Sequence, residues 1–172
     1  MSEKKTADVT GYIDTFIIKD EKNLHYRADK SKKIHVFAPT SYNKEVPHEV
    51  LYFFDAQNLF SKAGDYTDKN DPYGGWKLDE ALRDVYEKRG RNIIVVGMEN
   101  ADEYREKELF MAPEKFGKLS SLATDIGEVF AEGYLDELSA FMTETLHPMI
   151  KAKYNIDETY VGIGGSSMGG IA

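Results

Sequence analysis

The residues whose types and spacing best support chemistry form a glycine-serine cluster near the end of the sequence, at positions 164–170 (GGSSMGG). Within it, residues 165–169 match the pattern G-x-S-x-G, with Ser167 at the centre. In this pattern the serine lies on a sharp turn between a strand and a helix, and the glycines let the backbone approach without Cβ clashes. Such a serine can attack an acyl carbon, while the next backbone N–H, that of Met168, points at the developing oxyanion.

Two other interpretations of the cluster are weaker. A glycine-serine run is also typical of a flexible turn, but here an apolar run precedes it and small residues follow. A phosphate-binding loop is disfavoured, because no lysine follows and the glycine spacing differs from that of a P-loop. The register selects Ser167, because Ser166 would need a glycine where Met168 stands.

The segments that must position this serine have the pattern of an α/β protein. Two segments rich in β-branched and aromatic residues indicate strands at 10–19 and 33–38. Short continuous apolar runs at 50–54, 93–98 and 160–163 indicate strands that are buried on both faces, as in a parallel sheet. The order of elements predicts antiparallel strands at the start, followed by a mostly parallel, doubly wound sheet.

Helices are predicted between these strands. An apolar stripe over 78–85 ends at Gly90, and a longer stripe covers 135–149, with Pro148 near its end as a predicted kink. The irregular segments 57–76 and 100–131 each follow a buried strand, where ligand crevices form in open α/β sheets. We therefore predict a single, incomplete domain over residues 1–172.

Composition narrows the functional class. The 172 residues carry a formal charge of −8, which argues against nucleic acid and anionic membranes as partners. The absence of cysteine excludes disulfides and thiolate chemistry, and the longest apolar run, Ile93–Met98, is too short to span a bilayer. Residues 1–9 lack the apolar stretch of a signal peptide, so we expect a soluble, cytoplasmic protein.

An acidic cluster in the first irregular segment raises the question of a metal. The cluster lacks the spacing of a calcium-binding EF-hand loop, so we predict a solvated loop and no metal site. Its members are Asp65, Asp68, Asn70 and Asp71.

Four stretches together resemble the putative esterase family of α/β-hydrolases, the group around enterochelin esterases, S-formylglutathione hydrolase and some feruloyl esterases. They are residues 50–60 (VLYFFDAQNLF), 75–79 (GWKLD), 94–100 (IVVGMEN) and 165–170 (GSSMGG). Position 56, alanine here, is more often glycine in that family. The resemblance implies an α/β-hydrolase fold truncated after its nucleophile turn, and a serine carboxylic-ester hydrolase that forms an acyl-enzyme and needs no cofactor.

The resemblance also implies roles for residues after the third strand. The second oxyanion donor in this fold is a backbone N–H of that loop. By position it is Gln57, with Ala56 next, and such a donor is worth about 3 kcal/mol in the transition state. The alternative for Gln57 is a plain turn residue. Asp55 is expected to shape the turn rather than to serve as the triad acid, which in this fold follows the serine.

The candidates for the substrate pocket are Asp55, Ala56, Asn58, Trp76 and Asn100. For Trp76 we favour core packing at the start of a helix over a pocket wall. Asn100 and Arg105 follow a strand end and could contact a polar substrate, but a solvated loop is the favoured interpretation.

The catalytic base and acid are missing from the expected place. Five residues follow Ser167, and none is acidic or a histidine, whereas this fold orders the triad as serine, acid, histidine. Upstream, His25 and His35 fall in early strands, His48 precedes a buried strand and His147 lies on the long helix, so packing or surface roles are expected.

We therefore expect a fragment of a longer enzyme, with residues 160–163 left as an exposed, apolar sheet edge. Expected partners are a small-molecule ester and either the missing C-terminal half or a second copy. The alternatives are a non-catalytic remnant or pseudoenzyme, one half of a two-chain hydrolase, and an acyltransferase.

Overall fold

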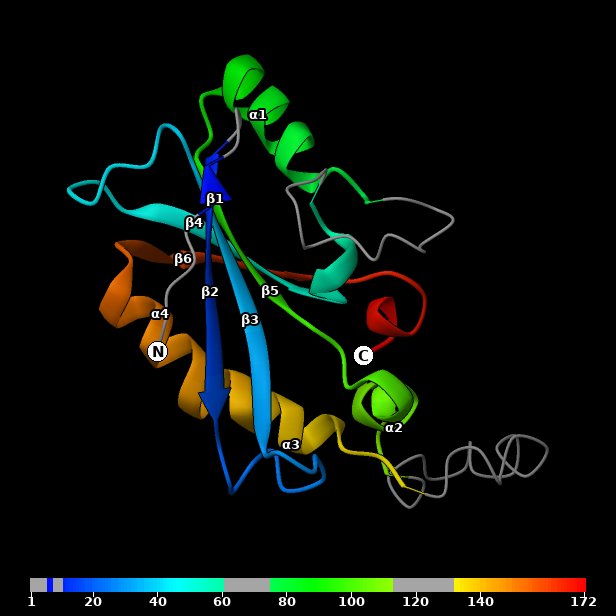
Figure 1. Cartoon of the computed structure of the whole chain (residues 1–172). Coiled ribbons are helices and arrows are strands. Elements are labelled where there is room, and N and C mark those ends of the chain that lie inside the picture. The colour runs from blue at the N-terminus through cyan, green and yellow to red at the C-terminus, as the bar shows by residue number, and fades with distance from the viewer. Residues whose placement is uncertain (1–5, 8–10, 61–74, 113–131) are drawn as a thin grey trace.

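The computed structural model describes residues 6–7, 11–60, 75–112 and 132–172. Six strands form one mixed sheet in the order β1-β2-β3-β5-β4-β6 (Figure 1). Their bounds are β1 (Thr6–Ala7), β2 (Gly11–Lys19), β3 (Ser31–Pro39), β4 (His48–Phe54), β5 (Ile93–Met98) and β6 (Ile156–Gly164). The acidic cluster at 65–71 lies outside the described residues.

The sheet divides into an antiparallel part and a parallel part. Strands β1, β2, β3 and β5 pair antiparallel in that order. Strands β5, β4 and β6 pair parallel, with Phe54 opposite Met98 and Phe53 opposite Gly164. The carboxyl ends of the three parallel strands therefore meet at one edge, which is where such sheets form ligand sites.

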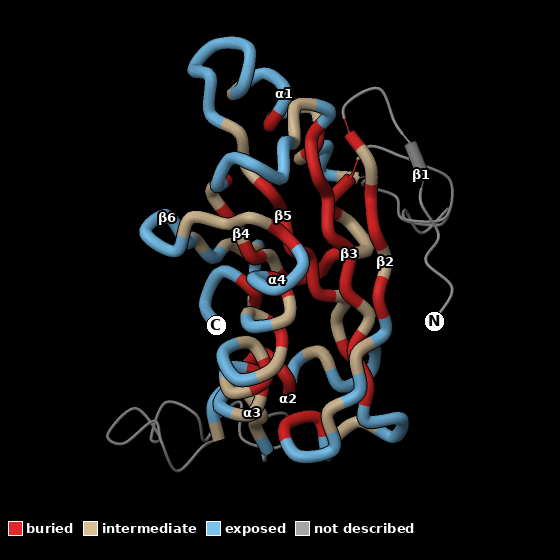
Figure 2. Tube along the Cα trace, turned by 90° about the vertical axis from the view of Figure 1, so that its left-hand side faces the viewer, coloured by how far each residue is buried: buried red, intermediate tan, exposed pale blue. Residues whose placement is uncertain are grey.

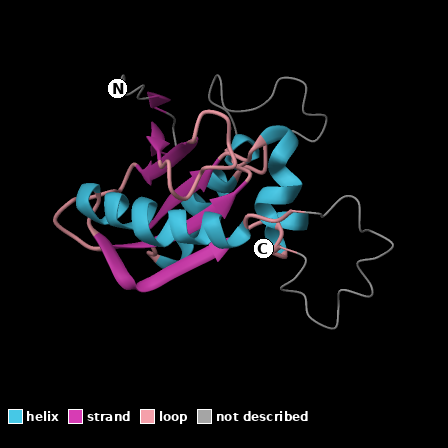
Figure 3. Ribbon diagram, turned by 90° about the horizontal axis from the view of Figure 1, so that it is seen from below, coloured by secondary structure: helices cyan, strands magenta, loops and turns pink. Residues whose placement is uncertain are grey.

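Helices follow the parallel strands. The α-helices are α1 (Leu78–Arg89), α2 (Arg105–Leu109), α3 (Leu135–Ala140) and α4 (His147–Lys153), and a π-helical segment, η5 (Phe141–Leu146), joins α3 to α4. Short 3-10 turns are η1 (Ala56–Asn58), η2 (Asp102–Tyr104) and η6 (Ser167–Gly170). Figure 3 shows the long α3–η5–α4 helix running alongside the strands. Among the described residues, no helix has the length and apolar character needed to cross a membrane.

Both faces of the central strands are covered, which explains their continuous apolar sequences. On one face, alternate residues of β4 such as Val50 and Tyr52 pack with Phe141 and Ile150 of the long helix. On the other face, Leu51 and its neighbours pack in a second core that includes Leu82 of α1.

Strand β6 differs from its neighbours because it forms an edge of the sheet. Figure 2 shows β3 and β5 as mostly buried and β4 as alternately buried and intermediate, whereas every residue of β6 is intermediate or exposed. Tyr160, Val161 and Ile163 keep 59%, 47% and 60% of their surface exposed. The predicted exposed edge is therefore present.

The predicted strands and helices all occur, most of them with shifted boundaries. Strand β5 coincides with the predicted run, while β6 begins at Ile156 instead of Tyr160. The predicted helix over 135–149 extends to Lys153 and contains the π-helical segment directly before Pro148, which lies in the first turn of α4. Because proline cannot donate a backbone hydrogen bond, a local change of helix type at this point is expected.

Candidate active site

The turn after β6 holds Ser167 in an uncommon backbone conformation. Its φ of 55° lies in the left-handed region, which few residues other than glycine adopt. The N–H of Gly169 donates to the Ser166 carbonyl at 3.0 Å, and this bond closes the turn. Strain of this kind concentrates at functional sites, where the surrounding structure holds it in place.

The glycines on either side of Ser167 lie in close contact with their surroundings, and Gly165 has no room for a side chain. A Cβ atom on Gly165 would overlap the carbonyl group of Gly169. A Cβ on Gly169 would lie 3.2 Å from Cβ of Phe54 and 3.3 Å from Oδ2 of Asp55. The serine turn is thus folded tightly on itself and pressed against the end of β4, and Ser167 is left exposed.

The turn after β4 is also strained. Asp55 adopts φ 58° and ψ 46°, again in the left-handed region, and η1 begins directly after it. The N–H of Asn58 donates to the Asp55 carbonyl at 3.0 Å. Ala56 is fully buried, and a Cβ on Gly97 of β5 would come within 2.8 Å of its methyl group. The turn that carries Gln57 therefore lies close against β5.

An ion pair holds the Asp55 side chain. Nε and Nη2 of Arg105 donate to its two carboxylate oxygens at 2.6 and 2.8 Å. Nδ2 of Asn100 adds a hydrogen bond to Oδ1 at 2.9 Å. Asp55 is 2% exposed and Arg105 is 23% exposed at the side chain. The guanidinium therefore compensates a carboxylate that is almost fully removed from water.

Electrostatics at this pair favour the charged forms. Burial acts to raise the pKa of Asp55, but hydrogen bonds from Arg105 and Asn100 outweigh it, so the pKa lies below its usual value. The hydrogen bond to Asp55 raises the pKa of Arg105 above its usual value. Asp55 is therefore an ionised structural partner at neutral pH.

The structure brings several predicted residues together. Asp55, Ala56 and Gln57 lie at the end of β4, Asn100 follows β5, and Ser167 and Met168 follow β6. The Asn100 N–H also approaches the side-chain oxygen of Gln57, at 3.4 Å.

The prediction of a solvated loop for Asn100 and Arg105 is wrong, because parallel strand ends place both residues beside Asp55.

The environment of Trp76 also differs from the one predicted. It keeps 39% of its surface exposed, so the prediction of core packing is wrong. The reason is its place before the helix: Lys77, at φ 55°, separates it from α1, and the Trp76 N–H donates to the Asn58 carbonyl at 2.6 Å. Trp76 thus stands next to the η1 turn instead of on the core-facing side of α1.

The histidines have partners elsewhere in the fold. The His25 ring contacts the Lys22 carbonyl, and the buried His48 ring contacts the carbonyl of Asn43. His35 is fully buried between Thr15 and Glu99, at 3.0 and 2.7 Å.

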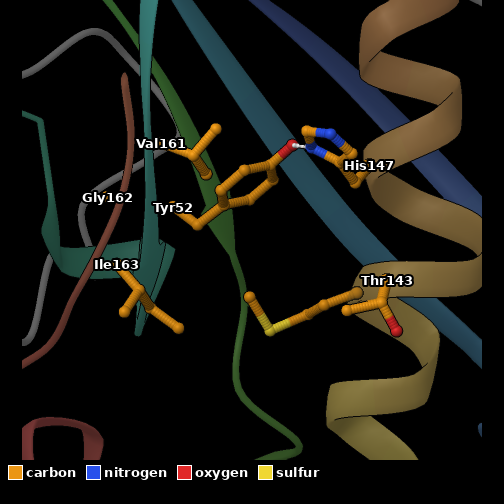
Figure 4. A pocket seen from close by; sticks show the side chains of 7 residues that line it. Tyr52, Thr143, His147, Val161, Gly162 and Ile163 are labelled. Carbon is orange, nitrogen blue, oxygen red and sulfur yellow. Dashed lines mark hydrogen bonds between the residues drawn. The ribbon is translucent and has the colours of Figure 1, made fainter. Parts of the chain in front are cut away.

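His147 lines an open pocket of about 350 Å³ between the long helix and β6. Its Nδ1 lies 2.8 Å from the Tyr52 hydroxyl, with Val161 and Ile163 of β6 on the far side of the pocket (Figure 4). The lining consists of Tyr52, Met142, Thr143, His147, Val161, Gly162 and Ile163. None of these belongs to the predicted site, and the pocket lies against the exposed edge strand.

Among the described residues, no group of three or more histidine, cysteine, aspartate or glutamate side chains is arranged to hold a metal ion.

A mixed sheet whose parallel strands carry a serine turn at their carboxyl edge is typical of the α/β-hydrolase class of fold. Within that class the chain belongs to the family described as Putative esterase, whose sequence profile matches residues 27–172. No curated protein sequence matches the chain.

Several solved structures share the fold. The BES protein from Bacillus cereus aligns with a TM-score of 0.60 at 16% identity, over 98% of this chain and 56% of that one. The enterobactin hydrolase IroE in complex with DFP gives 0.60 at 13% identity, over 95% and 56%. An S-formylglutathione hydrolase from Agrobacterium tumefaciens gives 0.55 at 17% identity, over 99% and 54%. The chain thus spans about half the length of these structural neighbours.

Proposed function

We propose that Ser167 is the nucleophile of a carboxylic-ester hydrolase that works through an acyl-enzyme intermediate. The observation that carries the proposal is the backbone of Ser167, held at φ 55° after β6 between Gly165, which has no room for a Cβ, and the tightly packed Gly169. Membership of the Putative esterase family supports hydrolase activity in general. The finer assignment rests on this turn and on the G-x-S-x-G pattern around it.

In the proposed reaction, Oγ of Ser167 attacks the ester carbonyl carbon and its proton passes to a histidine. The backbone N–H groups of Met168 and Gln57, or of Ala56 in place of Gln57, hold the oxyanion of the tetrahedral intermediate. Collapse expels the alcohol and leaves an acyl-serine, which water then hydrolyses. No metal or organic cofactor takes part.

The histidine and its acidic partner are proposed to lie in a part of the enzyme that this chain does not hold. The chain spans about 55% of its structural neighbours, so there is room for both residues in a longer protein. The four histidines described above are engaged with other partners, which supports this division. The complete enzyme, or a complex of two chains, is therefore the proposed active form.

The proposed substrate is a small-molecule ester. The structural neighbours include proteins described as an enterobactin hydrolase, an S-formylglutathione hydrolase and a ferulic acid esterase, so oxygen esters and thioesters are both within the class. Trp76, exposed beside the η1 turn, is a candidate pocket wall, together with Asn58. We also propose a cytoplasmic location, with neither nucleic acid nor membrane as partner, from the acidic charge and the lack of cysteine.

The test compares two adjacent serines in the complete protein. Hydrolysis of p-nitrophenyl acetate is measured for the wild type, Ser167→Ala and Ser166→Ala. We expect Ser167→Ala to lower kcat at least about 10³-fold, because it removes the nucleophile. Ser166 is also exposed and contributes only its backbone carbonyl to the turn, so its alanine variant is the matched control and should stay active.

A fluorophosphonate probe gives a second readout, because it should label the wild type and Ser166→Ala but not Ser167→Ala. Hydrolysis that survives Ser167→Ala would overturn the nucleophile assignment. A complete protein without hydrolysis or labelling would instead favour a non-catalytic member of the family.

A further inference from the structure

The Asp55 carboxylate joins three segments that meet at the carboxyl edge of the sheet. It belongs to the turn after β4, it accepts hydrogen bonds from Asn100 after β5 and from Arg105 at the start of α2, and it faces the serine turn after β6. We propose that Asp55 and Arg105 are positioning residues that set the separation of the two oxyanion donors. This inference rests on the proposed function of Ser167.

The first step is the backbone conformation of Asp55. Its left-handed φ and ψ turn the chain sharply after β4, and this turn determines where the N–H groups of Ala56 and Gln57 point. A residue other than glycine stays in this region only when its surroundings hold it there. Here the side chain itself provides the hold, because both carboxylate oxygens are bound by Arg105.

The second step is the contact with the serine turn. Oδ2 of Asp55, the oxygen that accepts from Nη2 of Arg105, would lie 3.3 Å from a Cβ on Gly169. A Cβ at position 169 would therefore be in tight contact with the carboxylate. The same carboxylate thus fixes its own turn and abuts the turn that carries Met168. It therefore controls the distance between the two N–H groups, to which oxyanion stabilisation is sensitive.

Two other roles for Asp55 fit less well. The triad acid of this fold follows the serine, whereas Asp55 precedes it and already accepts from Arg105 and Asn100. A pocket residue needs access to the substrate, whereas Asp55 is 2% exposed. Positioning through the backbone is the role that burial and full pairing allow.

The experiment uses Arg105 variants of the complete enzyme with p-nitrophenyl acetate as substrate. We expect Arg105→Ala to lower kcat about 10- to 100-fold, since a displacement of about 1 Å at a site can cost that much, with KM changed less than about threefold. Arg105→Lys keeps the charge but loses the two-pronged geometry, so it should recover part of kcat. The matched control is Arg91→Ala, because Arg91 forms the same kind of pair with Glu49 at the opposite end of β4.

A second readout separates positioning from general loss of structure. Phenylboronic acid forms a tetrahedral adduct on an active serine and so mimics the transition state. Its Ki should rise by the same factor by which kcat/KM falls in Arg105→Ala. Thermal unfolding of each variant identifies any that does not fold. If Arg105→Ala does not fold, Asp55→Asn replaces it in both measurements, because asparagine keeps the side-chain shape and tolerates the left-handed backbone.

The outcomes distinguish this inference from the proposed function. Wild-type kcat and boronate affinity in folded Arg105→Ala and Asp55→Asn, with Ser167→Ala inactive, would overturn positioning and leave the nucleophile in place. An equal loss of kcat in Arg91→Ala would also overturn it, because the effect would then be general. Activity that persists in Ser167→Ala would overturn both.

Discussion

Strands β4 and β5 carry a two-pronged arginine–carboxylate pair near each end, and the two pairs differ in their surroundings. Near the amino end, Arg91 donates to Glu49 through Nε and Nη2 at 2.9 and 2.5 Å, and the arginine side chain is 54% exposed. At the carboxyl end, Arg105 donates to Asp55 at 2.6 and 2.8 Å, and the carboxylate is almost fully buried. The chemistry of the two pairs is the same, so any difference in their effects must come from burial and backbone.

The backbone is the larger difference. Glu49 lies within β4, where its pairing with Ile93 of β5 holds the strand, although the register with β6 shifts between His48 and Val50. Asp55 lies one residue past the end of β4, in a left-handed conformation that no ladder holds. An exposed pair on a fixed strand adds little to stability, whereas a buried pair at a strained turn determines the local structure. The carboxyl edge of the sheet therefore depends on single residues in a way that the amino edge does not.

The largest effect is expected from an alanine at Gly165, compared with an alanine at Gly90. At Gly165 the new Cβ would overlap the Gly169 carbonyl, so the serine turn must open and kcat should fall at least about 100-fold. At Gly90, which ends α1 at φ 66°, nothing lies within 4 Å. Gly90→Ala should cost about 1 kcal/mol of stability through backbone strain and leave kcat unchanged.

The measurement is p-nitrophenyl acetate hydrolysis together with urea unfolding of both variants. Equal loss of activity in the two would mean that the carboxyl edge has no special dependence on the shape of its turns.

The second prediction concerns the stability of the two pairs. Asp55→Ala leaves Arg105 without its partner in a partly buried position, and we expect a loss of about 2 kcal/mol in the free energy of unfolding. Glu49→Ala should cost clearly less, because the exposed Arg91 returns to water. Urea denaturation at neutral pH measures both. A loss in Glu49→Ala as large as that in Asp55→Ala would contradict the assigned effect of burial.

The sequence predicted the central architecture because its signals are local. The apolar run Ile93–Met98 is continuous, and the strand it predicts is buried on both faces as expected. The serine turn is equally local, since G-x-S-x-G carries its own conformational requirement. Both features depend on neighbours in the chain, which pattern and spacing can show.

The Asp55–Arg105 pair was missed because it is not local. The two residues are separated by 50 positions and meet only when β4 and β5 align in parallel. An arginine in a polar stretch is most often solvated, so nothing at residue 105 itself indicated a buried partner. The one available signal was the placement of Asp55, Asn100 and Arg105 after two adjacent buried strands, read together with the parallel pairing.

The third prediction concerns the pH dependence of the stability that the Asp55 charge contributes at the carboxyl end of β4. The pKa of Asp55 is lowered in the folded protein, by Arg105 and Asn100 against the opposing effect of burial. The stability from its charged form is therefore fully present above the unfolded pKa of about 3.9, and is lost as pH falls through the lower folded value. Asp55→Asn removes this charge, so the difference in unfolding free energy between wild type and variant should shrink below about pH 4. Urea titrations at pH 7, 5, 4 and 3 test this, and a constant difference would contradict it.

The smallest effect is expected at the amino end. Arg91→Ala removes an exposed pair from a strand whose conformation is set by its neighbours, so kcat should be unchanged and any loss of stability small. Salt sharpens the comparison, because exposed charges are screened while buried pairs are screened much less. In 0.5 M NaCl the unfolding midpoint of Arg91→Ala should coincide with that of the wild type, whereas Arg105→Ala should remain clearly less stable at the same salt. If added salt removed both differences, the Asp55–Arg105 pair would behave as a surface contact, and burial could not be the reason why the two ends of β4 differ.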